Sequence, residues 1–149
     1  MNPHFERLDH KVSAFMQRWG IVSLRVSLAI IFIWFGLLKP FGLSSAQTLV
    51  EDTMRWMPLL SPHLWVVVIG FWEVAIGITF LFKSTVRIAI ALLAMQMVGT
   101  FMPLVILPTV TFQEGHFPYA PTLEGQYIIK NLLIISEALV IGGNLTQKK

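Results

Sequence analysis

Hydrophobic residues gather into four long apolar runs separated by shorter polar segments. The runs cover residues 19–38, 64–82, 88–109 and 125–145. Each approaches or reaches the roughly 20 apolar residues with which an α-helix crosses a bilayer. The pattern therefore predicts an all-α protein, an integral membrane four-helix antiparallel bundle that forms a single four-span domain over residues 1–149.

The two connections on one side of the predicted membrane are the longer ones. In the first, Ser44 followed by Gln47 matches a capping box, and mixed apolar and charged residues continue to Pro58. This predicts a short amphipathic helix on the membrane surface, ended by that proline. In the second, residues 110–126 carry two prolines and two glycines. They favour an irregular ordered cap rather than a strand.

The amino-acid composition excludes several classes of function. Hydrophobic residues make up 55% of the chain and charged residues only 13%, whereas soluble domains are about 25% charged. The chain has no cysteine, which excludes disulfides, iron–sulfur clusters and cysteine-based zinc sites. No nucleotide-binding or hydrolase motif is present. We therefore predict no metal site, no catalytic residue within the chain and no nucleic-acid partner, and we expect the lipid bilayer to surround the protein.

The placement of lysine and arginine predicts the orientation. With four spans, both termini and the middle connection lie on one side of the membrane, and most basic residues outside the spans fall there. Cytoplasmic segments carry this excess of positive charge. We therefore expect cytoplasmic N and C termini and a periplasmic short helix. The basic residues on the predicted cytoplasmic side are Arg7, Lys11, Arg18, Lys83, Arg87, Lys148 and Lys149, against Lys39 and Arg55 on the other side.

Several polar side chains fall inside the apolar runs, where each charge costs roughly 2.5–3.5 kcal/mol on insertion scales. Glu73, Gln96 and Glu137 lie near the centres of three different spans. Lys39 ends the first span and is expected to snorkel outward. The candidate ligand-binding or polar-network residues are Arg25, Lys39, Glu73, Gln96, Lys130, Asn131 and Glu137.

Two interpretations of these residues stay open. In one, they form an ion-paired core without chemistry, since Arg25, Lys130, Glu73 and Glu137 sum to zero charge. In the other, they line a polar site for a small molecule, a quinone or a proton. Gly70 and Gly77 share the helix face of Glu73 and would let another helix approach closely. Pro103 should kink the third span and free a backbone carbonyl toward the interior.

Several short motifs follow one another in a familiar order along the chain. They are Arg18-Trp19-Gly20, Leu24 to Leu28, Phe35 to Lys39, Gly70 to Gly77, Phe101 to Leu104, Phe117-Pro118-Tyr119 and Gly125 to Asn131. In these segments the chain resembles the YkgB/RclC family within the broader DoxX-like group. The resemblance implies a four-helix protein of the bacterial inner membrane, with Arg25, Lys39, Glu73, Lys130 and Asn131 as family-like polar positions. Known relatives are linked to oxidant resistance, and more distant ones to a quinone-reducing enzyme.

The leading functional hypothesis is an accessory or binding protein for a quinone, lipid or other small amphiphile, with a link to oxidant stress. Its interhelical polar pocket would open toward the outer face. A quinone is the candidate cofactor. One alternative is a membrane subunit of a quinone-coupled oxidoreductase whose redox centre lies on a membrane or periplasmic partner. Another is a homo-oligomeric transporter or proton-conducting protein, because four helices are few for a monomeric carrier.

Overall fold

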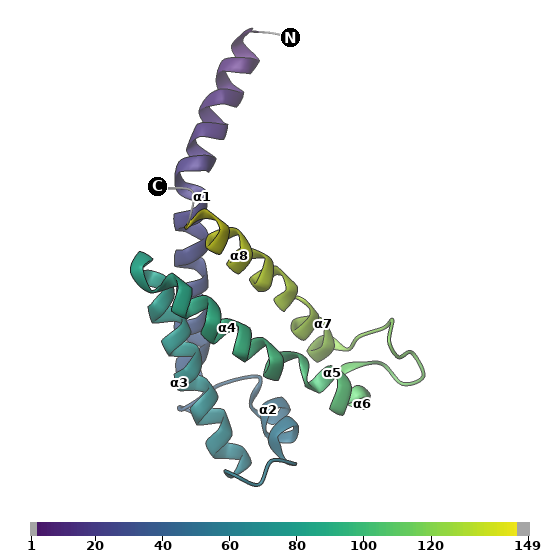
Figure 1. Cartoon of the computed structure of the whole chain (residues 1–149). Coiled ribbons are helices and arrows are strands. Elements are labelled where there is room, and N and C mark those ends of the chain that lie inside the picture. Colours follow the sequence, from purple (N-terminus) through teal and green to yellow (C-terminus); the bar gives the residue numbers. More distant parts are fainter. Residues whose placement is uncertain (1–2, 146–149) are drawn as a thin grey trace.

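The computed structural model describes residues 3–145, and within them the chain is helical with one isolated β-bridge between Phe112 and Pro121. Four helical stretches are long and apolar enough to cross a membrane, which confirms the predicted four-span all-α fold. Figure 1 shows their arrangement. The elements are α1 (Pro3–Leu38), α2 (Gln47–Met54), α3 (Pro62–Leu81), η1 (Lys83–Thr85), α4 (Val86–Phe101), α5 (Pro103–Ile106), α6 (Pro108–Thr111), α7 (Leu123–Ile129) and α8 (Asn131–Asn144).

Helix α1 is much longer than the apolar run that predicted it. It begins at Pro3, where proline suits the first turn of a helix. Residues 6–19 are exposed, and Figure 1 shows this part of α1 rising clear of the other helices. At 36 residues, α1 is about 54 Å long, well beyond a bilayer core of about 30 Å. The first half of α1 therefore projects from the bundle.

Helices α1 and α3 run antiparallel and are shifted relative to each other along their axes. The side chain of Arg25 reaches the carbonyls at the end of α3, and Lys39, just after α1, reaches Glu73 near the middle of α3. Helix α1 thus ends halfway along α3. Helix α2 packs against α3 as well, and Figure 1 shows it beside the half of α3 that extends beyond α1.

The hydrophobic core lies where α1, α3, α4 and α8 meet. Its residues come from all four helices, so no helix pair could bury this surface alone. The α3–α4 turn is tied together by Thr85, whose hydroxyl donates to the carbonyls of Thr79 (2.7 Å) and Phe82 (3.1 Å). The largest fully buried side chains of this core are Phe80, Leu28, Ile76, Leu93, Ile141 and Val86.

The third span is broken where the proline predicts. Helix α4 ends at Phe101 and α5 begins at Pro103, which confirms the kink. The Gly99 carbonyl, four residues before the proline, accepts from Met102 N–H at 3.3 Å. A tighter turn thus uses the acceptor that the proline leaves. A second break, at Pro108, separates α5 from α6.

The fourth span is interrupted at Lys130, between α7 and α8. The Asn131 side-chain amide donates to the carbonyls of Tyr127 (2.9 Å) and Ile128 (3.1 Å). Asparagine side chains compete in this way for carbonyls that backbone N–H groups would otherwise use. A continuous helix over this run was therefore only an approximation.

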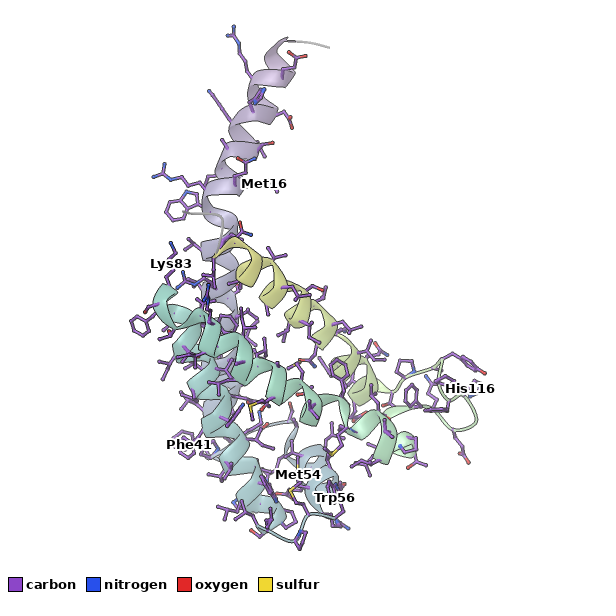
Figure 2. The ribbon with its side chains drawn as sticks, in the orientation of Figure 1. Met16, Phe41, Met54, Trp56, Lys83 and His116 are labelled. Atoms are coloured by element: carbon purple, nitrogen blue, oxygen red, sulfur yellow. The ribbon has the colours of Figure 1, made fainter. Side chains whose placement is uncertain are left out.

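The short helix predicted between the first two spans is present as α2, but its cap differs. Ala46 is the N-cap and makes no side-chain capping bond, while the Ser44 hydroxyl accepts from Ala46 N–H at 3.3 Å. The helix ends at Met54, before Pro58, and packs against α3 with Met54 buried (Figure 2). The later connection is irregular, as predicted, and Lys148 and Lys149 lie outside the described residues.

Candidate functional site

Helices α1 and α3 touch backbone to backbone through glycine. A Cβ atom at Gly36 would lie 2.7 Å from the Gly70 carbonyl oxygen, and one at Gly70 would lie 2.7 Å from the Gly36 carbonyl oxygen. A Cβ at Gly77 would lie 2.8 Å from the Ala29 carbonyl oxygen. This confirms that the glycine face of α3 lets another helix approach closely. The close approach also presses the side chains beside the crossing together.

Lys39 and Glu73 form a buried ion pair at this crossing. The Lys39 ammonium donates to Glu73 Oε2, and the two side chains are only 7% and 13% exposed. The expectation that Lys39 snorkels is therefore wrong. Because α1 ends halfway along α3, Lys39, which directly follows it, meets the buried Glu73 carboxylate.

Gln96 of α4 binds the other oxygen of the same carboxylate. Its amide Nε2 donates to Glu73 Oε1 at 3.2 Å. A second tie between α3 and α4 is the bond from Trp72 Nε1 to the Leu92 carbonyl, also 3.2 Å. We call Lys39, Glu73 and Gln96 the polar cluster. It joins the end of α1 to the middles of α3 and α4.

Arg25 binds backbone carbonyls instead of the Glu73 carboxylate. Its guanidinium donates to the carbonyls of Phe80 (Nε, 3.0 Å) and Leu81 (Nη2, 2.6 Å). The last carbonyls of a helix lack intrahelical donors and carry partial negative charge, which a cation satisfies. Arg25 therefore closes the end of α3 and contacts no carboxylate of the described chain.

The structure does not bring the polar residues of the fourth span to the cluster. Lys130 is exposed, with its ammonium 5.3 Å from the centre of the Tyr127 ring. Asn131 bonds within its own helix, as described above. Glu137 is half-buried and forms no ion pair among residues 3–145. The charge-balanced network of Arg25, Glu73, Lys130 and Glu137 is therefore not assembled.

Trp65 of α3 is a polar feature that sequence reasoning missed. Its indole Nε1 is buried and has no hydrogen-bond partner among the described residues. Trp65 lies two turns before Trp72 on the same helix face, in the half of α3 that α2 covers. Its sequence signal was an aromatic at the predicted membrane boundary, where tryptophan is common, and this gave no hint of an unsatisfied donor.

Comparison with known protein families identifies the family of this chain. A sequence profile of the DoxX family matches residues 20–107. The chain belongs to the DoxX family. The matched range contains Arg25 and the complete polar cluster but ends before α7 and α8. No curated protein and no solved structure matched this DoxX protein. Together, the family and the four apolar helices identify a small multi-pass membrane protein.

Proposed function

We propose that this DoxX protein binds a small amphiphile at the polar cluster, with a quinone as the first candidate. The observation that carries the proposal is the Glu73 carboxylate, held by Lys39 and Gln96 in the middle of a spanning helix. Ionisable groups at such depth are costly and commonly mark sites of function. Arg25 is an example of the alternative, a charged residue in a span with a purely structural role, because its hydrogen bonds go to the last carbonyls of α3.

The cluster can both donate and accept hydrogen bonds. An ammonium group has three N–H donors and a side-chain amide has two, and only one of each is directed at Glu73. The remaining donors suit the carbonyl oxygens of a quinone, while the carboxylate suits the hydroxyl of a quinol. The Trp72 ring, whose Nε1 donates to the Leu92 carbonyl, packs against the hydrophobic core of the same helices.

The wider setting belongs to the same proposal. The DoxX profile and the distribution of basic residues support a protein of the bacterial inner membrane with both termini in the cytoplasm. The resemblance to the YkgB/RclC subgroup supports a role in oxidant resistance. Without cysteine, the chain has no thiol relay of its own. We therefore assign it binding, with any electron transfer on a partner.

The test is mass spectrometry of the amphiphiles that co-purify with the protein in mild detergent. The informative variant is the double substitution Lys39→Met with Glu73→Gln, which removes both charges of the cluster without leaving either one buried alone. The matched control is Glu137→Gln, because that acid lies in a spanning helix outside the cluster. We expect about one quinone per wild-type chain, a loss of tenfold or more in the double variant, and retention in the control.

Two results would contradict this function. A wild-type protein without quinone or another defined amphiphile would make the cluster a structural device. Equal amounts of bound quinone in the wild type and in a correctly folded double variant would place any binding elsewhere. Gln96→Leu gives an independent check, since it removes a neutral donor and leaves the Lys39–Glu73 pair intact.

A further inference from the structure

A second polar feature lies at the turn between α3 and α4, away from the polar cluster. An open cleft of about 430 Å³ is lined there by Lys83, Ser84, Arg87 and Leu145. Figure 2 shows Lys83 where the chain turns from α3 into α4, and Figure 1 shows that α8 ends on the same side of the bundle, nearer the projecting half of α1. The cleft thus lies between the α3–α4 turn and the end of the last spanning helix.

The depth of the cleft matches the boundary between the hydrocarbon and the headgroups. After Glu73, helix α3 carries no charged side chain up to Leu81, and the next charged residue is Lys83, two positions later. Leu145 is the apolar side chain among the lining residues, beside Lys83, Ser84 and Arg87. A ligand that is charged at one end and apolar at the other would find both surfaces here.

The cleft carries positive charge from two exposed side chains, Lys83 and Arg87. Neither Lys83 nor Arg87 forms an ion pair with any residue in the range 3–145. The negative end of α3 does not compensate them, because Arg25 already occupies the carbonyls of Phe80 and Leu81. The local field in the cleft therefore favours an anion.

The first turn of α4 adds backbone donors to the same place. Thr85 is the N-cap of α4, where a threonine hydroxyl normally accepts from the first N–H groups. Here that hydroxyl donates backward to Thr79 and Phe82, and α4 has no side-chain cap. Arg87, which lines the cleft, lies in this first turn.

We propose that the cleft binds a phosphate-bearing anion, the headgroup of an anionic phospholipid being the occupant that its depth favours. Phosphate oxygens pair well with guanidinium, ammonium and helix N-terminal N–H groups. Basic pockets between spanning helices at the cytoplasmic surface bind anionic headgroups in this way. The site is separate from the polar cluster, so it does not depend on the function proposed above.

The experiment measures lipid retention by native mass spectrometry of the full chain in mild detergent. Dioleoyl phosphatidylglycerol is compared with dioleoyl phosphatidylcholine, with and without millimolar inorganic phosphate. The test variant is Lys83→Gln with Arg87→Gln. The control is Arg7→Gln with Lys11→Gln, which removes the same charge from the exposed projecting half of α1. Ser84→Asp is a second test variant, because it keeps both cations and adds a negative charge to the cleft.

We expect the wild type to prefer phosphatidylglycerol. We expect both test variants to lower its retention by about tenfold, while the control changes it less than about twofold. Binding of inorganic phosphate without any preference for phosphatidylglycerol over phosphatidylcholine would keep the anion site but overturn the lipid as its occupant. Unchanged retention in the test variants, or an equal loss in the control, would overturn the site.

Discussion

The buried pair of Lys39 and Glu73 makes a quantitative prediction about stability. Removing one partner of a buried ion pair leaves an uncompensated charge and costs about 3–5 kcal/mol, whereas replacing both partners with neutral groups is often close to neutral. The side chains are 7% and 13% exposed, so solvent can screen little of the remaining charge. Lys39→Met and Glu73→Gln should each destabilise the fold by about 3–5 kcal/mol.

The double variant should recover most of that loss. With both charges gone, the amide oxygen that Glu73→Gln introduces can still accept the hydrogen bond from Gln96. This amide is neutral and has nearly the shape of the carboxylate that it replaces. Independent effects would sum to about 6–10 kcal/mol, but we expect a double variant only about 1–2 kcal/mol less stable than the wild type. The large favourable coupling between the two substitutions would come from the shared burial of the pair.

The coupling can be measured by reversible unfolding in a denaturing detergent, followed through the fluorescence of the five tryptophans. Wild type, both single variants and the double variant complete the cycle. Losses below about 1 kcal/mol in each single variant, a size typical of solvent-exposed pairs, would refute the burial of the pair. Additive losses would show that the two residues act separately.

Four further substitutions test the packing and hydrogen bonding of the helices. Gly36→Ala would set a Cβ against the Gly70 carbonyl and should lower the free energy of unfolding by about 1–3 kcal/mol. Gly99→Ala places its Cβ in open space and should be neutral or stabilising by up to about 1 kcal/mol. Unfolding of both variants in a denaturing detergent measures this contrast. Arg25→Met removes two charge-assisted bonds and should cost about 2–4 kcal/mol, and an unchanged unfolding midpoint would count against its capping role. Trp65→Phe removes a buried donor that has no partner among the described residues, so the fold should be unchanged or about 1 kcal/mol more stable in the same assay.

The number of spans followed from the sequence because apolar length alone is sufficient to identify a membrane helix. The same reasoning placed the start of the first helix at residue 19, since it measured hydropathy rather than helix formation. Residues 3–18 are polar on average, yet nothing after Pro3 breaks the helix. The proline break at residue 103 was predictable because it is local, whereas the break at Lys130 depends on a side-chain bond from Asn131.

The candidate site was only partly accessible from the sequence. The free-energy cost of placing polar groups in a membrane span identified Glu73, Gln96 and Lys39 as residues that need an explanation. The glycines on the helix face of Glu73 predicted a close helix contact. They could not pair Lys39 with Glu73, because the pairing depends on how far α1 slides along α3. That offset is a tertiary property, set by the contact between Gly36 and Gly70.

The length of α1 links two places that are otherwise far apart. The last turn of α1 leads directly into Lys39, while its first half stands outside the bundle as an uninterrupted helix. A rigid rod transmits rotation along its axis without loss. If a ligand displaced Lys39 and turned α1 by a few degrees, the projecting half would turn by the same angle, and a probe placed near its free end would report events inside the membrane.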